Sequence, residues 1–353
     1  MRILLTGTRA PATLDLARRL WREGAEVIGA DSLRFPLGRF SRAFTSHHRV
    51  PPPRQAPEAF FQAVSRLLIE HKIDLLWPTC EEIFHLARFH QSLSGLTRML
   101  CEPLEKLLQL HHKLHFAQFV SSLGDQVLAP DSWPAEQAPS QGRLVWKPCF
   151  SRFGAQTRFD TPPENPQDWM AQTFIAGEEF CCWALCVDGI VHALTFYRAA
   201  ARAGRGASCA FDPLWSEPAA EFVRKLAAHF SFTGSLAFDF ITALDGRIFV
   251  IECNPRLTSG LHVLDPMVSL LEALQSPLAL PTPQRACQVF LPTLFSCPSI
   301  AGKSPDVIHS RDDRRPAWGQ ALSVLEFAGV ALRRRLSLLE ATTHDIEYNG
   351  EGA

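Results

Sequence analysis

The sequence predicts an α/β protein in which a parallel sheet is followed by a region rich in antiparallel strands. The chain has 353 residues, 46% of them hydrophobic and 20% charged, which is enough apolar material for more than one core. Strands alternate with helices near the start of the chain, a pattern typical of a parallel sheet. From Leu144 onward, short strands alternate with tight turns such as Asp188-Gly189, which indicates hairpins. We expect two or three compact units.

The first unit, residues 1–103, should open with a strand, a loop and a helix. Arg2 to Thr6 is a short apolar run that stops at Gly7, and Leu14 to Trp21 carries apolar residues at helical spacing. The next expected elements are a strand at Glu26 to Asp31, a helix at Pro57 to His71 and a strand at Ile73 to Trp77. Because ligands bind beyond the carboxyl ends of parallel strands, Thr6 to Arg9 and Thr79 to Glu82 are candidate ligand loops.

The central unit, residues 104–265, is predicted to begin with one long helix and to continue as β structure. Leu104 to Leu123 is helical by its period, and Gly124 is suited to end the helix. A second helix, Pro218 to Phe230, interrupts the strands. The expected strands are Leu144 to Lys147, a run around Phe174, Phe180 to Val187, Val191 to Phe196, Leu236 to Ile241 and Arg247 to Ile251.

Two carboxylates and an amide form the clearest chemical signal in the sequence. Asp239 and Glu252 lie on two strands joined by the turn Asp245-Gly246, so their side chains can face each other across an antiparallel ladder. Asn254 lies two residues beyond Glu252 and shares its face. Either carboxylate alone would more often be an ordinary surface residue. Together the three oxygen donors suit Mg²⁺, which prefers a few carboxylates with phosphate and water, so the trio predicts a magnesium site whose natural partner is a nucleotide.

The motif Phe238-Asp-Phe240, followed by Phe249-Val-Ile-Glu-Cys-Asn-Pro-Arg256, resembles the ATP-grasp family. That family includes D-alanine:D-alanine ligase, biotin carboxylase and glutathione synthetase, and the match is to bacterial members with an ECNPR-TSG type of motif. The resemblance covers roughly residues 104–264. It implies an ATP-grasp fold, in which two α+β subdomains clasp ATP, preceded by a Rossmann-like parallel α/β domain at 1–103. It also implies a lid subdomain at about 118–175 and a C-terminal segment, 266–353, that packs on the core.

The resemblance assigns phosphate contacts to two lysines and a loop. Lys113 and Lys147 match the family's two ATP-contacting lysines, and mobile cations complement the charge of a triphosphate. Pro148 to Gly154 resembles the flexible loop whose backbone amides hold the phosphates, with Ser151 and Gly154 as contacts.

The resemblance also assigns the adenosine and metal contacts. Gln172 and the backbone of Thr173, Phe174 and Ile175 match the hinge segment that reads the adenine edge. Glu179 would accept hydrogen bonds from the ribose. Asp239, Glu252 and Asn254 match the metal ligands, for two Mg²⁺ ions, with Mn²⁺ as an alternative ion.

Arginines are predicted to bind the substrate and its activated form. Arg256, just beyond the metal trio, can hold a carboxylate by a bidentate contact, with a structural salt bridge as the ordinary alternative. Arg198, Arg202 and Arg205 follow a strand on a Gly-rich segment and could close over the phosphates, or could only solvate a loop. Further candidate substrate residues are Arg9, Glu81, Glu82 and Ser259, although the two glutamates also suit the start of a helix. Relatives commonly carry a basic residue two positions before the metal-binding aspartate, where this chain has Ala237.

The mechanism that the resemblance implies has two steps. The substrate carboxylate attacks the γ-phosphate of ATP to give an acyl phosphate and ADP, and an amine then displaces phosphate. Such a reaction depends on positioning and charge neutralisation more than on a nucleophilic side chain. A small-molecule kinase or an acid-thiol ligase on the same fold is the first alternative. A non-catalytic ATP-binding regulatory module is the second.

Composition limits the partners and the compartment. Thirty-five basic and 36 acidic residues give a net charge of -1, which favours neither nucleic acid nor an anionic membrane as a partner. The expected partners are a small-molecule carboxylate and an amine, and the resemblance allows a homodimer. The ten cysteines include no CxxC pair and are expected to be reduced thiols of a cytoplasmic protein, with Cys149 and Cys253 as buried fillers. His111 and His115, four apart on the predicted helix, are expected to pack rather than to bind metal.

Overall fold

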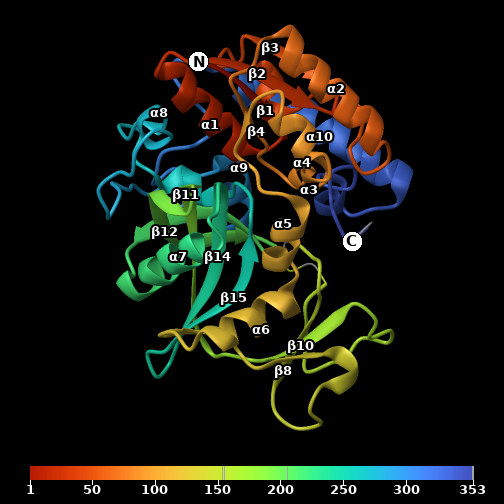
Figure 1. Ribbon diagram of the computed structural model, residues 1–353, viewed down its shortest axis with the longest axis vertical. Helices are drawn as coiled ribbons and strands as arrows, with labels where there is room; N and C mark the ends of the chain where they lie inside the picture. Colours follow the sequence, from red (N-terminus) through yellow and green to blue (C-terminus); the bar gives the residue numbers. More distant parts are fainter. Residues whose placement is uncertain (153, 155, 205, 352–353) are drawn as a thin grey trace.

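The computed structural model describes residues 1–351 except 153, 155 and 205, and its first unit is a five-stranded sheet with strand order β3-β2-β1-β4-β5 (Figure 1). All of its strand pairs are parallel, as predicted. The strands are β1 (Arg2–Thr6), β2 (Glu26–Asp31), β3 (Ser46–Arg49), β4 (Leu75–Trp77) and β5 (Arg98–Met99). The helices are α1 (Pro11–Arg22), η1 (Leu37–Phe40), α2 (Pro57–Glu70), α3 (Glu82–Ala87) and α4 (His90–Ser94). Because β1 and β4 are buried on both faces, their sequences read as uninterrupted apolar runs.

The loops after β1 and β4 touch each other at Gly7. This residue has φ +68°, and an added Cβ would lie 2.8 Å from both Cys80 Sγ and Glu82 Oε1. Only glycine fits there, because both the backbone conformation and the space exclude a side chain. The two ligand loops predicted from the sequence therefore form one surface at the carboxyl edge of the sheet.

A seven-stranded sheet, in the order β16-β13-β12-β11-β14-β15-β6, forms the centre of the molecule. Its strands are β6 (Val127–Leu128), β11 (Gly177–Val187), β12 (Ile190–Ala203), β13 (Ala207–Leu214), β14 (Gly234–Ala243), β15 (Ile248–Asn254) and β16 (Cys287–Gln288), and α7 (Glu217–His229) lies between β13 and β14 in the chain. Phe180, Phe238 and Phe240 point into one core with α7, while Trp183 and Leu185 point to the opposite face and pack against the first unit. This alternation places Asp239, two residues from Ala237 and opposite Cys181, on the face toward the first unit.

A separate four-stranded sheet, in the order β7-β10-β8-β9, spans Ser132 to Thr173. Its strands are β7 (Ser132–Pro134), β8 (Leu144–Pro148), β9 (Arg158–Phe159) and β10 (Trp169–Thr173), with η2 (Ala135–Gln137) between the first two. In Figure 1, β8 and β10 lie at the end of the molecule opposite to β1 and β4. Arg152, in the connection from β8 to β9, contacts Glu81 of the first unit.

The long helix predicted over residues 104–123 is two helices, α5 (Leu104–His111) and α6 (Lys113–Leu123). The break is at His112, whose ψ of 106° is extended and whose side chain accepts a hydrogen bond from His115 N at 3.2 Å as an N-cap. The sequence suggested that His111 and His115 lie four residues apart on one helix. In the structure they belong to two different helices, α5 and α6. His111 stacks on Phe84 with 4.5 Å between ring centroids, and His115 stacks on His112.

The C-terminal part adds elements to both units. They are η3 (Ser259–Val263), α8 (Leu270–Ala273), α9 (Phe290–Ser296), α10 (Arg315–Arg334) and α11 (Leu338–Ala341). Figure 1 shows α10 beside the red and orange elements of the first unit, where it packs on η1. Among the residues that the structure describes, no helix combines the length and apolarity needed to cross a membrane.

Candidate functional site

The β14–β15 hairpin brings the predicted metal ligands together. Asp239 pairs directly with Glu252, and Ala237 pairs with Asn254, so the three polar residues share one face. Asn254 Nδ2 donates to Glu252 Oε1 at 2.9 Å, which orients the amide so that its Oδ1 accepts from Arg256 Nη2. A register shift between Asp239 and Phe240 keeps the two carboxylates opposite each other.

Both predicted lysines reach this pair from other elements. Lys113, the first residue of α6, has its Nζ 3.6 Å from Glu252 Oε2, and Lys147 on β8 donates to the Ile251 carbonyl at 3.1 Å. Both side chains are buried. Burial lowers the pKa of Lys147 to about 8, an effect that the nearby Lys113 reinforces and Glu252 opposes.

The electrostatics of the carboxylate pair suit a cation. Burial and the charge of Glu252 raise the pKa of Asp239. Burial alone would raise the pKa of Glu252 as well, but Lys113 and Lys147 outweigh it and lower that pKa. Two carboxylates that face each other repel when both are charged, and a divalent ion between them would remove the repulsion. The donor set therefore fits Mg²⁺.

The third predicted ligand is an amide. Over the described parts of the chain, no three His, Cys, Asp or Glu side chains gather as metal ligands. Asn254, which pairs with Ala237 in the neighbouring strand, brings an amide side chain to the same face. Ala237 also lies opposite Trp183, which is fully buried, so the bulky indole fills the space next to this alanine.

The loop after β8 is held close to the site. Lys113 Nζ donates to the carbonyl of Ser151 at 2.8 Å, and Gly154 has φ +58° and closes a turn with Thr157. The neighbouring Arg152 forms an ion pair with Glu81, 2.8 Å from Nε to Oε2. The predicted phosphate loop and the predicted metal ligands thus meet at Lys113.

Glu81 connects this loop to Arg256. Its Oε1 lies 3.4 Å from Arg256 Nη2, and the same nitrogen donates to Asn254 Oδ1 at 3.2 Å. Burial alone would raise the pKa of Glu81, but Arg152 and Arg256 outweigh it and lower the pKa. Arg256 Nε is buried without a hydrogen-bond partner among the described residues, which leaves a donor for a ligand.

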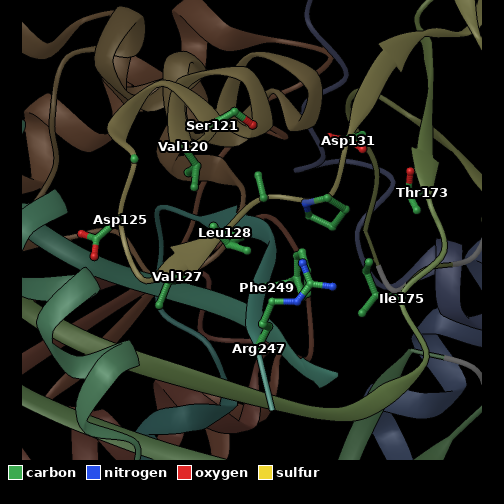
Figure 2. A pocket seen from close by; sticks show the side chains of 13 residues that line it. Val120, Ser121, Asp125, Val127, Leu128, Asp131, Thr173, Ile175, Arg247 and Phe249 are labelled. Atoms are coloured by element: carbon green, nitrogen blue, oxygen red, sulfur yellow. The ribbon is translucent and has the colours of Figure 1, made fainter. Parts of the chain in front are cut away.

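The hinge residues lie at the edge of a cavity of about 360 Å³, shown in Figure 2. Thr173 and Ile175 line it from one side, and Phe249 of β15 lines it from another with Arg247, the residue before that strand. The amides of Thr173 and Phe174 donate to the carbonyls of Asp131 and Arg143. Gln172 is buried, and its Nε2 donates to Ser132 Oγ at 3.0 Å, which leaves its Oε1 as an acceptor.

The arginines expected on a loop after Phe196 are placed differently. β12 continues to Ala203, so Arg198 and Arg202 are residues of a long hairpin and not of a loop. Arg202 pairs with Glu179 at 2.5 Å and Arg198 with Glu178 at 3.6 Å, so the predicted ribose ligand Glu179 already has a cationic partner. Arg205 lies outside the described residues.

Three further candidates lie in the first unit and near η3. Arg9 is buried between Asp31 and Asp345, at 2.6 Å from each carboxylate. Glu82 accepts hydrogen bonds from Thr6 Oγ1 and from the amides of Thr79 and Cys80. Arg9 and Glu82 therefore hold the protein's own loops together, while Ser259, at the start of η3, is half-buried.

Sequence patterns did not reveal the role of Arg152 or of the segment 342–349, which we call the tail. The tail crosses the carboxyl ends of β1, β2 and β4, where Asp345, Glu347 and Tyr348 make the contacts. The only sequence signal was the run of acidic and polar residues from Thr342 to Asn349.

Comparisons with known proteins give a domain match and similar folds. Residues 111–260 match the family described as ATP-grasp domain. No curated protein matches the sequence significantly. The L-amino acid ligase of Bacillus licheniformis is similar in structure, with a TM-score of 0.60 and 15% identity over 78% of this chain and 74% of that chain. The N5-carboxyaminoimidazole synthetase of Staphylococcus aureus, solved with ADP, has a TM-score of 0.61 and 14% identity over 80% of this chain and 79% of that one.

A third similar structure carries a nucleotide and its metal. It is the biotin carboxylase domain of the 2-oxoglutarate carboxylase of Hydrogenobacter thermophilus, in complex with MgADP and bicarbonate. Its TM-score is 0.60 and its identity 12%, over 80% of this chain and 71% of that chain. At such identities these likenesses show the fold, and the family match locates the domain. Residues 111–260 therefore match an ATP-grasp domain, and the structure has the ATP-grasp fold.

Proposed function

We propose that this protein is an ATP-dependent ligase that activates a small-molecule carboxylate as an acyl phosphate and couples it to an amine, releasing ADP and phosphate. One observation carries the proposal: two buried lysines from α6 and β8 converge on the Asp239–Glu252 pair. A binding-only module would not need two carboxylates beside two lysines. The nucleotide would lie between the four-stranded sheet and the β14–β15 hairpin.

Different residues would bind the phosphates and the adenine of the nucleotide. Lys113 and Lys147 would neutralise the phosphates, and the Ser151 to Gly154 loop would cover them. At the hinge, Gln172 Oε1 would accept from the adenine amino group. The amide of Ile175 has no backbone acceptor among the described residues and would donate to a ring nitrogen, since those of Thr173 and Phe174 are already bonded.

Asp239, Glu252 and Asn254 would hold Mg²⁺, which supplies charge neutralisation at the transferring phosphoryl group. Arg256 would orient the substrate carboxylate with its unpaired Nε and hold the acyl phosphate until the amine attacks. In this reaction the carboxylate oxygen bonds to the γ-phosphorus as ADP leaves. The amine nitrogen then bonds to the acyl carbon, phosphate leaves, and the amine loses a proton. A site that faces small-molecule substrates and ten free cysteines support a cytoplasmic enzyme.

ATP turnover with pooled substrates tests the proposal. The protein is incubated with Mg²⁺ and ATP against pools of carboxylic acids and amines, and both ADP and phosphate are followed. We expect release of one ADP and one phosphate per coupled acid, and its loss in Glu252→Gln. A stable phosphorylated product would instead indicate a kinase, and an acid-dependent product only with thiols would indicate an acid-thiol ligase. ATP binding without turnover on any pool would refute the ligase.

A further inference from the structure

We propose that Arg152 is a positioning residue, through which the tail and Glu81 hold the phosphate-covering loop over the nucleotide site. The role of the loop in this inference rests on the function proposed above, whereas the attachment of the loop to the tail does not. Arg152 lies in the middle of the loop between β8 and β9, and its side chain is only 11% exposed. A buried cation in a loop of this kind needs partners, and the structure supplies them from two distant parts of the chain.

Arg152 meets four groups outside its own loop. Its Nε is 2.8 Å from Glu81 Oε2, and its Nη1 pairs with Glu347 of the tail. Its Nη2 donates to the Tyr348 carbonyl at 3.0 Å and to Asn349 Oδ1 at 2.8 Å. The planar guanidinium can satisfy several acceptors at once, which a lysine cannot do in the same geometry.

The two residues before Arg152 are held as well. The ring of Phe150 lies edge-on to Tyr348 at 5.9 Å and to His112 at 5.0 Å. The carbonyl of Ser151 accepts from Lys113, so the loop is attached on one side to the tail and on the other to a predicted phosphate lysine. Three consecutive loop residues therefore have fixed partners.

The tail can hold the loop in place because Asp345 and Tyr348 are buried in contacts with the first unit. Asp345 pairs with Arg9, and Tyr348 is fully buried and stacks on Phe84 at 5.3 Å. The Glu347 carbonyl is 3.2 Å from His85 Nε2, and its carboxylate also pairs with Arg54. Glu347 thus joins a cation of the first unit to the cation of the loop.

Glu81 extends this connection to the substrate side. One of its oxygens faces Arg152 and the other faces Arg256 at 3.4 Å. The loop that would cover the phosphates and the arginine that would hold the acid therefore depend on the same carboxylate. A loop held in this way is already close to its working position before the nucleotide arrives, which reduces the ordering cost of binding.

Limited trypsin digestion without nucleotide tests the attachment directly. Trypsin must extract an arginine side chain to cut after it, so cleavage after Arg152 reports the fraction of time that this side chain is free. The exposed Arg158 on β9, in the same connection, is the internal reference. Glu347→Gln removes the tail's carboxylate from Arg152, and Glu351→Gln is the matched control, because Glu351 pairs with Arg54 but not with Arg152.

We expect cleavage after Arg152 to be about tenfold faster in Glu347→Gln than in the unmodified protein, with cleavage after Arg158 unchanged, as the loss of one charge-assisted hydrogen bond predicts. Asn349→Ala, a milder change in the same contact, should give a smaller increase in the same direction. Glu351→Gln should leave the ratio unchanged. Equal cleavage after Arg152 and Arg158 in the unmodified protein, or no increase in Glu347→Gln, would overturn the attachment.

Addition of ATP with Mg²⁺ separates this inference from the proposed function. If both hold, the nucleotide slows cleavage after Arg152 in every variant, and Glu347→Gln raises KM for ATP about tenfold with a smaller effect on kcat. If ATP changes neither cleavage nor turnover while Glu347→Gln still frees Arg152, the loop is attached but the ligase proposal fails. If Glu347→Gln lowers kcat and leaves KM unchanged, the positioning role for the nucleotide is refuted.

Discussion

Asp239 and Glu252 are paired directly across β14 and β15, yet their surroundings shift their pKa values in opposite directions. Burial and the neighbouring charge favour a proton on Asp239, whereas Lys113 and Lys147 keep Glu252 ionised despite its burial. The two carboxylates would repel each other when both are charged, and a bound divalent cation would remove that repulsion. The two carboxylates should respond differently to substitution.

Replacing Asp239 by asparagine should abolish turnover but stabilise the metal-free protein. A carboxyl group with a raised pKa in the folded state costs stability as the pH rises through that pKa, and asparagine removes the cost. We expect Asp239→Asn in a chelator at neutral pH to unfold roughly 1–3 °C higher than the unmodified protein, with the gap closing in acid. Thermal scans at several pH values measure it. Asp245→Asn, on the exposed turn of the same hairpin, should change neither property, and a lower melting temperature for Asp239→Asn would contradict the repulsion.

ATP affinity should fall as the pH rises above about 8, the pKa to which burial lowers Lys147. The free protein loses this proton above that pH, whereas the bound triphosphate favours the charged lysine, so binding must take the proton up again. The decline can reach at most about tenfold per pH unit for one proton. Calorimetry in two buffers of different ionisation enthalpy measures both the affinity and the proton uptake. Lys147→Arg keeps its charge and should bind with no such dependence; an identical pH profile in that variant would assign the effect to another group.

Asp345→Asn should destabilise the first unit by about 3 kcal/mol, since it removes one carboxylate from the buried arginine it shares with Asp31. Burial would raise the pKa of Asp345, but Arg9 lowers it well below its usual range, so its contribution is present above about pH 4 and lost as the pH falls further. Urea titrations at neutral and acid pH test this. The exposed pair of Arg22 and Asp312 is the comparison, and Asp312→Asn should cost at most about 0.5 kcal/mol.

Gly260→Ala should cost about 2 kcal/mol through overpacking. An added Cβ would lie 2.5 Å from Trp183 Cβ and 3.1 Å from Trp183 N, and neither the buried indole nor the β11 backbone can move aside easily. Denaturant unfolding measures the loss. Gly95→Ala is the control: its nearest neighbour would be 3.5 Å away and its φ is -72°, so alanine should be neutral or stabilising by about 0.5 kcal/mol. Equal effects of the two changes would argue against the tight contact at Trp183.

The sequence allowed the proximity of Asp239, Glu252 and Asn254 to be predicted because one tight turn joins the two strands that carry them. Counted from the turn alone, Asp239 would lie opposite Ile251, and the irregularity between Asp239 and Phe240 shifts the register so that it lies opposite Glu252. The end of β12 was not predictable in this way. Its extension runs through Ala199, Ala200 and Ala201, and alanine has little preference for strands, so only pairing with β13 reveals it.

Contacts between distant parts of the chain could not be predicted from the sequence patterns. Arg152 and Glu347 are 195 residues apart, and their pairing exists only because the tail docks across the first unit. No periodicity or motif encodes such a contact, since it depends on the packing of whole elements. The helix break at His112 was also not predicted, because the apolar period continues through it while the backbone does not.

The burial of Arg9 by Asp345 can be completed only late in the synthesis of the chain. The ribosome must add 336 residues between the two, which at ordinary elongation rates takes on the order of tens of seconds. During that interval the first sheet can assemble, but the carboxyl edge of its strands remains uncovered and Arg9 has only Asp31 as a buried partner. The unit that emerges first is thus among the last to be completed. A ribosome-bound chain that stops before Asp345 should expose this edge to proteases and chaperones, while the full-length chain protects it.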